Sequence, residues 1–318
     1  MKNIYLNIFK FNKKILKKTI KFLKKNKIVG LPTETVYGLA GNAYSKIAVN
    51  KIYKLKKRPS FNPLIIHYYG INDINKDVNI TSDFIKLYKK LCPGPITFIL
   101  KKKKKSKISS LALAKLNTVA VRFPSHPVMR KILKFLPFPL AAPSANISSR
   151  ISPTNSYDVA EEFKKNIKII IDGGNSEVGI ESTVIDLTKK IKILRPGIIT
   201  KKNIKKILKK NISIPKKLVS IKAPGSLKKH YSPGIPIILN SKSPFKKHAF
   251  ISFGNKFKKT KNSFSLSNTS NLKIAAKNLY KILRKIKKLK YKKIYISKIP
   301  NHGIGIALND RIKRAAQK

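Results

Sequence analysis

The sequence predicts an α/β protein, with one large layered domain followed by a smaller α/β domain. Short apolar runs such as residues 28–31 alternate along the chain with amphipathic segments such as residues 13–25, which is the pattern of strands and helices in layers. The apolar residues within each run are consecutive, which indicates strands that are buried on both faces. A length of 318 residues suits one large and one small domain.

The elements of the large domain follow from local signals. Ser45 is placed to cap a helix, Pro127 suits a first helical turn, and the Pro-Gly-Pro at 93–95 ends the helix before it. From these signals and the apolar spacing we expect helices at 13–25, 45–56, 82–91, 127–135, 157–165 and 200–210. We expect strands at 28–31, 64–68, 96–100, 118–123, 140–142, 169–172 and 182–187.

A linker and a second domain are predicted after residue 210. Residues 211–235 contain Pro215, Pro224 and Pro233 and show no regular pattern. Beyond them we expect strands at 235–239, 249–253 and 291–296, and helices at 272–286 and 304–316. The expected organisation is a large domain over 1–210, a linker over 211–235 and a small α/β domain over 236–318.

The chain is strongly basic, with 72 Lys and Arg against 12 Asp and Glu and a net charge of +60. Such a charge prompts a nucleic-acid hypothesis. However, only eight of the basic residues are arginine, and Ile and Asn are also abundant, which favours a genome with A/T-rich codons. The lysines form solvated faces such as 101–105, without a basic stripe interleaved with aromatics. Weak, salt-sensitive RNA binding follows from the charge in either case.

Cysteine use and hydropathy favour a cytoplasmic protein without membrane contact. The single Cys92 fits a reducing compartment, and five scattered His form no zinc-type cluster. The longest apolar runs are far below the ~18 residues that a membrane helix needs. We see no apolar leader with a small-residue cleavage site.

Polar side chains gather just past the predicted strand ends, where open α/β sheets place their ligands. These clusters are Thr33-Glu34-Thr35, Lys56 with Arg58, Asn62, His67, Thr118 with Arg122, Ser144 with Asn146, Glu181-Ser182-Thr183, and Arg195. Three of the eight arginines lie in them. In a chain that uses lysine almost everywhere, arginine indicates planar recognition of phosphate or carboxylate. Each cluster alone is more simply a surface or capping feature, but together they favour a site for an anionic ligand.

Several common catalytic motifs are missing from the sequence. It has no GxxxxGK[ST] phosphate loop, no GxSxG elbow and no triad spacing around its histidines. Gly303 and Gly305 begin a dinucleotide-binding pattern, but Leu308 stands where the third glycine belongs. We interpret this segment as a tight turn before the last helix.

The chain resembles the YrdC-like threonylcarbamoyl-AMP synthases over about residues 13–210. The resemblance rests on these ordered motifs: Leu-Pro-Thr-Glu-Thr-Val-Tyr-Gly-Leu at 31–39, Lys-x-Arg-Pro-x-x-Asn-Pro-Leu at 56–64, Pro-Gly-Pro-x-Thr at 93–97, Val-Ala-Val-Arg at 119–122, Pro-Ser-Ala-Asn at 143–146, Glu-Ser-Thr-Val-x-Asp at 181–186 and Leu-Arg-Pro-Gly at 194–197. Residues 223–233 resemble the linker of the two-domain members. The implied fold is a twisted mixed sheet with an open concave site, followed by a smaller Rossmann-like domain.

The resemblance implies an ATP-dependent reaction. L-threonine and bicarbonate or CO2 give a threonine carbamate, which attacks the α-phosphate of ATP to form L-threonylcarbamoyl-AMP and pyrophosphate. A separate tRNA threonylcarbamoyl transferase then uses the adduct to modify the adenosine next to the anticodon. Mg²⁺ would be held mainly by the triphosphate, with no protein ligand assigned. The alternatives are a basic double-stranded-RNA-binding module without catalysis and, last, a carbamoyl-adenylate domain of the hydrogenase-maturation type.

The resemblance also implies roles for individual residues. Lys56, Arg58 and Arg122 would neutralise charge at the reacting phosphorus. The threonine-binding residues would be Thr35, His67, Thr118, Arg122 and Ser182. The ATP-binding residues would be Arg58, Asn62, Ala142, Ser144, Ser152, Arg195 and Tyr231. Tyr231 would fold over the nucleotide as a lid, although a peg that holds the linker on the domain surface is almost equally favoured.

Three residues depart from the family pattern. Lys57 and Ser149 replace glycines, which alters one turn and implies mild strain where the backbone is left-handed. Ser232 replaces a small apolar residue in the linker. None of the three removes a charged or ligand-binding group. In the small domain the resemblance rests mainly on residues 305–312.

Overall fold

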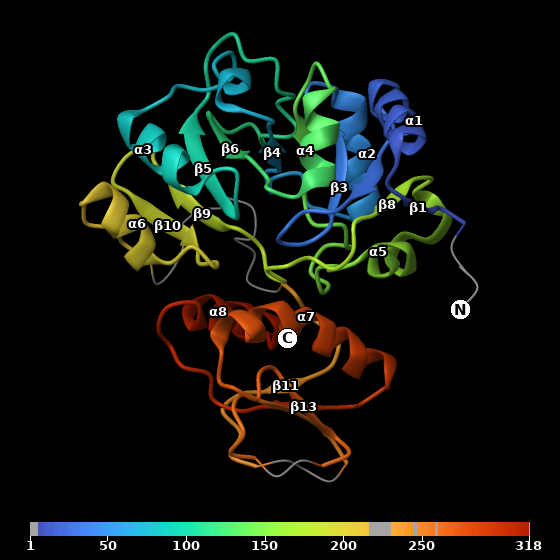
Figure 1. Cartoon of the computed structure of the whole chain (residues 1–318), viewed down its shortest axis with the longest axis vertical. Helices are drawn as coiled ribbons and strands as arrows, with labels where there is room; N and C mark the ends of the chain where they lie inside the picture. Colours follow the sequence, from blue (N-terminus) through green and yellow to red (C-terminus); the bar gives the residue numbers. More distant parts are fainter. Residues whose placement is uncertain (1–5, 216–229, 244–246, 258–259, 318) are drawn as a thin grey trace.

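The computed structural model describes residues 6–215, 230–243, 247–257 and 260–317, and it confirms the α/β class with a large and a small domain (Figure 1). The large domain forms the upper body in Figure 1, and the small domain, coloured orange to red, lies below it. Residues 216–229 of the predicted linker lie outside the described residues. Among the helices of the described chain, none is both long and apolar enough to cross a membrane.

One mixed sheet organises the large domain. Its ten strands follow the order β1-β8-β2-β3-β7-β4-β6-β5-β9-β10. They are β1 (Ile8–Lys10), β2 (Val29–Leu31), β3 (Gly38–Asn42), β4 (Ile65–His67), β5 (Ile96–Lys101), β6 (Thr118–Arg122), β7 (Leu140–Ala141), β8 (Ile170–Asp172), β9 (Thr183–Asp186) and β10 (Lys192–Arg195). The central strands β4 and β6 are parallel, so their carboxyl ends meet at one edge of the sheet.

The helices of the large domain begin and end within two residues of the predicted positions. They are α1 (Lys13–Lys24), α2 (Lys46–Lys56), α3 (Ser82–Leu91), α4 (Pro127–Lys134), α5 (Ser156–Phe163) and α6 (Lys201–Leu208), with 3-10 turns at Ile71–Ile74 and Lys164–Asn166. Ser45 caps α2 as expected, because its hydroxyl accepts a hydrogen bond from the amide of Ala48 at 3.2 Å. Pro127 opens α4. Ile204 and Leu208 of α6 pack into the core of the large domain.

Four strands were not predicted: β1, β3, β10 and β13 (Ser263–Ser265). β3 contains two glycines, which weaken any strand pattern, yet it pairs antiparallel with both β2 and β7. Gly41 suits the close packing there, since a Cβ atom would lie 2.7 Å from the terminal methyl of Ile28 and 3.3 Å from that of Ile52, so these side chains would have to shift. The strand therefore forms because its neighbours pair with it and α2 packs closely over it.

The sheet is buried on both faces, as the consecutive apolar runs predicted. Ile170 packs into the cluster that includes residues of α2 and α5, whereas its neighbours Ile169 and Ile171 pack with α1 and α4 on the other face. That second face continues over β4, β6, β5 and β9. There the apolar cluster consists of Ile65, Ile99, Ala120 and Val184, and it includes no buried helix residue. This half of the face is the floor of the concave site.

The small domain is a parallel α/β unit, in agreement with the expected Rossmann-like architecture. Its sheet has the order β11-β14-β12-β13, and every pairing is parallel. Its remaining elements are β11 (Ile237–Ile238), β12 (Ala249–Ser252), α7 (Leu272–Lys288), β14 (Ile294–Ile296) and α8 (Gly305–Ala315). Figure 1 shows α7 and α8 between the small sheet and the large domain. The two helices thus bring their side chains to the domain interface.

Two of the three departures from the family pattern are left-handed, as a glycine at those positions indicates. Lys57 has φ +48° and is the C-cap of α2, and Ser149 has φ +69°. The left-handed conformation costs a non-glycine residue about 1–2 kcal/mol, because Cβ approaches the following carbonyl. Lys57 is also solvent-exposed, so its side chain gains little packing in return.

We predict that Lys57→Gly stabilises the protein by roughly 0.5–1 kcal/mol, since the relieved strain exceeds the added chain entropy of glycine. The matched control is Lys54→Gly, an exposed residue inside α2, which should destabilise by about 1 kcal/mol. Urea unfolding measures both free energies. A destabilising Lys57→Gly would contradict the strain that we assign to this cap.

Candidate active site

A pocket with an empty volume of about 510 Å³, counted to its open mouth, lies on the uncovered half of the sheet. Seven residues predicted for the site line it, namely Arg58, His67, Arg122, Ala142, Ser144, Arg195 and Tyr231. Other lining residues were not predicted as ligand contacts, among them Thr33, Tyr37, Ile65, Glu181 and His230.

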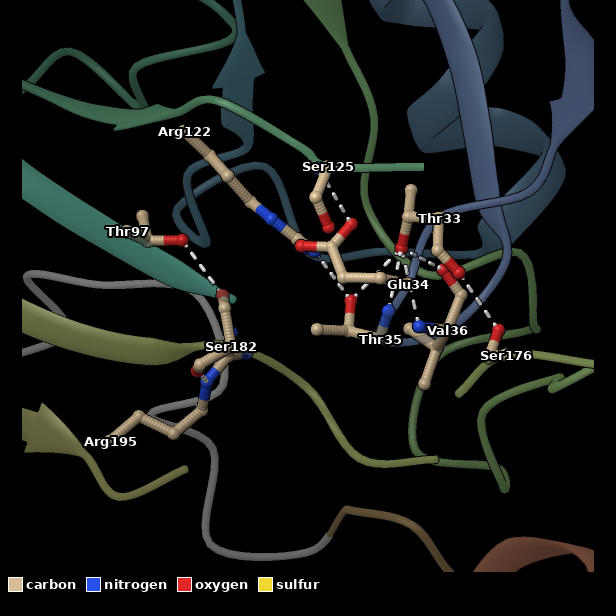
Figure 2. Close-up of polar contacts among 10 residues, drawn as sticks. All are labelled: Thr33, Glu34, Thr35, Val36, Thr97, Arg122, Ser125, Ser176, Ser182 and Arg195. Atoms are coloured by element: carbon tan, nitrogen blue, oxygen red, sulfur yellow. Dashed lines mark hydrogen bonds and ion pairs between the residues drawn. The ribbon is translucent and has the colours of Figure 1, made fainter. Parts of the chain in front are cut away.

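Arg122 occupies one side of the pocket and is held by its Nη2 atom alone. Nη2 donates to Glu34 Oε1 at 2.8 Å and to Thr35 Oγ1 at 2.7 Å (Figure 2). Nε is buried and has no hydrogen-bond partner among the described residues. The planar guanidinium therefore keeps a donor available, which is what a substrate carboxylate needs. Thr35 does not line the pocket, but its hydroxyl accepts a hydrogen bond from Arg122, which does line it.

The loop that carries Thr35 is rigid because one hydroxyl organises it. Thr33 Oγ1 donates to the carbonyl of Val36 at 2.6 Å and accepts from the amide of Thr35 at 3.2 Å. Ser176 Oγ donates to the Thr33 carbonyl at 3.0 Å (Figure 2). Glu34 Oε2 accepts from the amide of Ser125 at 3.2 Å, which fixes the carboxylate that holds Arg122.

His67 lies beside Arg122 because β4 and β6 pair in register at these two residues. Its side chain is buried, and Nδ1 has no hydrogen-bond partner within the described chain. Burial, followed by the charge of Arg122, lowers the pKa of His67 to about 3. The imidazole is therefore neutral at pH 7 and can exchange a hydrogen bond with a ligand hydroxyl or amine without adding charge.

Arg58 and Asn62 form a self-supporting loop on another wall. Arg58 donates from Nε to the Asn62 carbonyl at 3.0 Å and from Nη2 to Asn62 Oδ1 at 2.6 Å. Burial lowers the pKa of Arg58 to about 10, which leaves it charged at neutral pH. The Nδ2 atom of Asn62 is buried without a partner in the described structure. Asn62 thus positions Arg58 and retains one unused donor.

Arg195 is aimed into the pocket by an irregularity in the sheet. The register between β9 and β10 shifts between Ile193 and Arg195, and such a bulge turns a side chain out of its alternating position. Arg195 donates from Nε to the Ser182 carbonyl at 3.0 Å and from Nη2 to Ser182 Oγ at 3.1 Å. Ser182 in turn shares a 2.8 Å hydrogen bond with Thr97 (Figure 2).

Glu181 lines the pocket, and its carboxylate is surrounded by donors from both domains. Ser152 Oγ donates to Oε1 at 2.6 Å, Tyr280 donates to Oε2 at 2.9 Å, and Arg311 Nε donates to Oε2 at 2.9 Å. Burial alone would raise the pKa of Glu181, but the charges of Arg311 and Arg195 outweigh burial and lower it to about 2. Ser152 reaches the site through Glu181 rather than by lining the pocket.

Tyr231 is fully buried and joins the pocket to the small domain. Its ring stacks on Tyr280 with centroids 5.7 Å apart, and the Arg311 guanidinium lies 5.2 Å from its centroid. The ring of His230 is 4.0 Å away, and the Ser232 amide donates to the carbonyl of Ser149 at 2.8 Å. In this conformation Tyr231 lines the pocket and packs against the small domain, whereas its role as a lid over the nucleotide stays a prediction.

Lys56 and Thr118 do not line the pocket. Lys56 Nζ donates to the carbonyls of Ser144 and Asn146, at 2.6 Å each, and thereby braces the loop that carries Ser144. Burial and then the charge of Arg58 lower the pKa of Lys56 well below its usual value. Thr118 lies at the start of β6, four residues from Arg122 at its end. A catalytic role for Lys56 and threonine binding by Thr118 stay predictions.

Sequence reasoning also missed two residues of the small domain that contact the pocket wall, Arg311 and Tyr280. Arg311 and Tyr280 lie more than 85 residues beyond the last predicted strand of the large domain, and no pattern links them to it. The sequence signal that could have identified Arg311 is the scarcity of arginine, because the chain has only eight. For metals, the described residues contain no group of three or more His, Cys, Asp or Glu side chains that could hold an ion.

Comparisons with known proteins agree with this geometry. Residues 21–197 match the family model Sua5_yciO_yrdC, described as "Telomere recombination", and residues 199–317 match "Threonylcarbamoyl-AMP synthase, C-terminal domain". The threonylcarbamoyl-AMP synthases of Pyrococcus abyssi and Bacillus subtilis are each 35% identical to the chain. The alignments cover 93% of this chain and 92% of the archaeal protein, and 92% of this chain and 90% of the bacterial one.

A solved structure gives the same result for the fold. The crystal structure of P. abyssi Sua5 complexed with L-threonine is 32% identical, covers 97% of each chain and superposes with a TM-score of 0.89. Both domains are included in that match. The pocket, the two family models and the full-length relatives therefore place this chain in the two-domain threonylcarbamoyl-AMP synthase family.

Proposed function

We propose that this protein makes L-threonylcarbamoyl-AMP from L-threonine, bicarbonate and ATP, with release of pyrophosphate. The observation that carries the proposal is the charge distribution of one pocket. Arg122 and the neutral His67 lie side by side at the ends of β4 and β6, while Arg58 and Arg195 occupy other walls. One amino-acid head and one phosphate chain are the ligands that this arrangement suits.

The chemistry requires no side-chain nucleophile. The threonine amine forms a C–N bond with bicarbonate and water leaves, which gives a carbamate. A carbamate oxygen then bonds to the α-phosphorus as the bond to the bridging oxygen of the β-phosphate breaks, and that oxygen leaves with pyrophosphate. The protein must align the two reactants and offset the negative charge of the phosphates. Arg58, Arg122 and Arg195 supply fixed positive charge for this purpose.

Mg²⁺ would enter with the triphosphate and shield its charge. The two carboxylates at the pocket are already engaged, Glu34 by Arg122 and Glu181 by Arg311. Neither is free to act as a metal ligand of the kind that Mg²⁺ takes from proteins. The downstream consumer of the adduct would be a tRNA threonylcarbamoyl transferase. Binding of double-stranded RNA as the sole function is not favoured, because the comparisons match synthases over both domains.

The direct test is pyrophosphate release by the full chain with ATP, Mg²⁺ and bicarbonate, with and without L-threonine. We expect release that requires both threonine and bicarbonate, together with a product of the mass of threonylcarbamoyl-AMP. Release that is independent of threonine, or folded protein that binds ATP without any turnover, would contradict the proposal.

We predict that Arg122→Gln raises the KM for L-threonine roughly 10- to 100-fold, the loss expected for a charge-assisted hydrogen bond. The KM for ATP should change little, because Arg58 and Arg195 are intact. Arg122→Lys should recover only part of the loss, since a lysine lacks the planar fork. The control is Arg150→Gln, whose side chain is 51% exposed. Equal threonine KM values in Arg122→Gln and the wild type would contradict the assignment.

Arg58→Gln should show the opposite pattern, with an ATP KM raised about 10-fold or more and a nearly unchanged threonine KM. The substitution also removes the contacts to Asn62, so thermal unfolding of the variant has to be measured beside its kinetics. If Arg58→Gln and Arg122→Gln raised the same KM, the division of the pocket into two ligand halves would be wrong.

A further inference from the structure

Glu181 is the point at which the small domain reaches the pocket. Of the side chains that donate hydrogen bonds to its carboxylate, Ser152 belongs to the large domain, whereas Tyr280 comes from α7 and Arg311 from α8. Glu181 is 6% exposed and Arg311 and Tyr280 are both fully buried. Figure 1 shows that α7 and α8 are the helices of the small domain that face the large domain.

Arg311 uses its fork to connect several groups at once. Nε donates to Glu181 at 2.9 Å and Nη1 donates to Asp310 Oδ2 at 2.7 Å. Asp310 Oδ1 also accepts from Arg314 Nε at 2.8 Å. A chain of alternating charges thus runs along α8 to the pocket wall. The guanidinium plane of Arg311 additionally lies 5.2 Å from the ring centroid of Tyr231, which lines the same pocket.

The stability of the domain interface alone does not explain why the Arg311–Glu181 ion pair is buried between the domains. A buried ion pair often stabilises the folded protein no more than an apolar pair of the same shape would. Removing one partner of the pair is strongly destabilising, because the other charge is left buried and uncompensated. The interface already has an exposed ion pair for docking, in which Lys288 Nζ donates to Glu161 Oε1 at 2.5 Å. The Arg311–Glu181 pair differs because its carboxylate is part of the pocket wall.

We propose that Arg311 is a positioning residue for the nucleotide half of the pocket. It holds the Glu181 carboxylate against Ser152 and supports the ring of Tyr231, so that the small domain completes the wall along which ATP lies. The inference rests on the proposed function only for the identity of the ligand. It assigns no contact between Arg311 and substrate, because Arg311 is not among the residues that line the pocket.

The proposal has an electrostatic consequence for Glu181. The charged and titratable groups that face it are Arg195 from β10, Arg311 from α8, Tyr280 from α7, and His230 and Tyr231 from the linker. Without Arg311, burial would raise the pKa of Glu181 from about 2. A protonated Glu181 donates where it formerly accepted, so the hydroxyl of Ser152 would lose its fixed orientation. The acid limb of ATP binding should therefore move to higher pH in the variant.

The experiment measures the affinities of full-length protein for ATP·Mg²⁺ and for L-threonine separately, by calorimetry across pH 5 to 8. We expect Arg311→Gln to weaken ATP binding about 10-fold or more, with threonine binding within about twofold of the wild type. Arg311→Lys should recover part of the ATP affinity. The control is Lys288→Gln, which removes the exposed interdomain ion pair and should change neither affinity.

A double-mutant cycle separates positioning through Glu181 from an independent effect. If Arg311 acts through Glu181, Glu181→Gln combined with Arg311→Gln should bind ATP no more weakly than Arg311→Gln alone. If the losses of ATP affinity in the two single variants multiplied in the double variant, the inference would be wrong. Tyr280→Phe keeps the ring that stacks on Tyr231 and removes one hydrogen-bond donor to Glu181. It is therefore the variant to measure if Arg311→Gln does not fold. We expect it to lower the affinity for ATP, by less than Arg311→Gln does, and to leave the affinity for threonine unchanged.

The outcome also separates this inference from the proposed function. Suppose that the wild-type protein turns over ATP with threonine and that Arg311→Gln and Tyr280→Phe bind ATP as tightly as the wild type. That result would refute the role of Arg311 and leave the synthase activity standing. If the wild-type protein bound ATP with an affinity that Arg311→Gln weakened, but released no pyrophosphate, the synthase proposal would be refuted and the positioning role of Arg311 would stand.

Discussion

The parallel pairing of β4 with β6 is the constraint on which the rest of the site depends. Because His67 and Arg122 are partners in that register, an imidazole and a guanidinium lie together at the carboxyl edge of two central strands. A slip of one strand by one residue would turn its side chain to the opposite face and separate the pair. The face that carries them is covered by α1 and α4 over one half only, and over the other half the polar pair borders the apolar cluster of Ile65, Ile99, Ala120 and Val184.

Arginine and lysine have different roles in this chain. The lysines carry nearly all of the positive charge, and those that the structure describes are mostly exposed, where any cation solubilises the surface equally well. The arginines at the pocket are buried or half-buried and use defined edges of the guanidinium, as Arg58 does with Asn62 and Arg195 with Ser182. A lysine lacks the planar, rigid fork of donors that these contacts use, which explains why arginine persists at these positions in a lysine-rich sequence.

Lys56 has a structural contact in addition to the catalytic role that the family motif implies. Its Nζ is buried and donates to two backbone carbonyls of the Ser144 loop. That arrangement satisfies a buried cation without any ligand. The residue therefore shapes the pocket from behind, and only movement of the loop would bring the ammonium to a phosphate.

Most of the fold was predictable, because helix caps such as Ser45 and consecutive apolar runs are local signals that each segment carries in itself. β3 was missed since its glycines disfavour a strand in isolation, and it forms only because β2 and β7 pair with it on either side. The same division applies to the pocket. Motifs indicated Arg58, His67, Arg122 and Arg195, which lie on segments with a recognisable pattern.

By itself, the sequence determined the α/β class, the two domains and the arginine-rich set of site residues, since periodicity, caps and residue type are properties of short segments. Tertiary structure alone decided which donor on Arg122 stays unpaired, which way the bulge aims Arg195, and that Glu181 meets Arg311 across 130 residues. Those features depend on strand register and domain docking, where groups distant in the chain compete for the same hydrogen bonds, and no local pattern records the result.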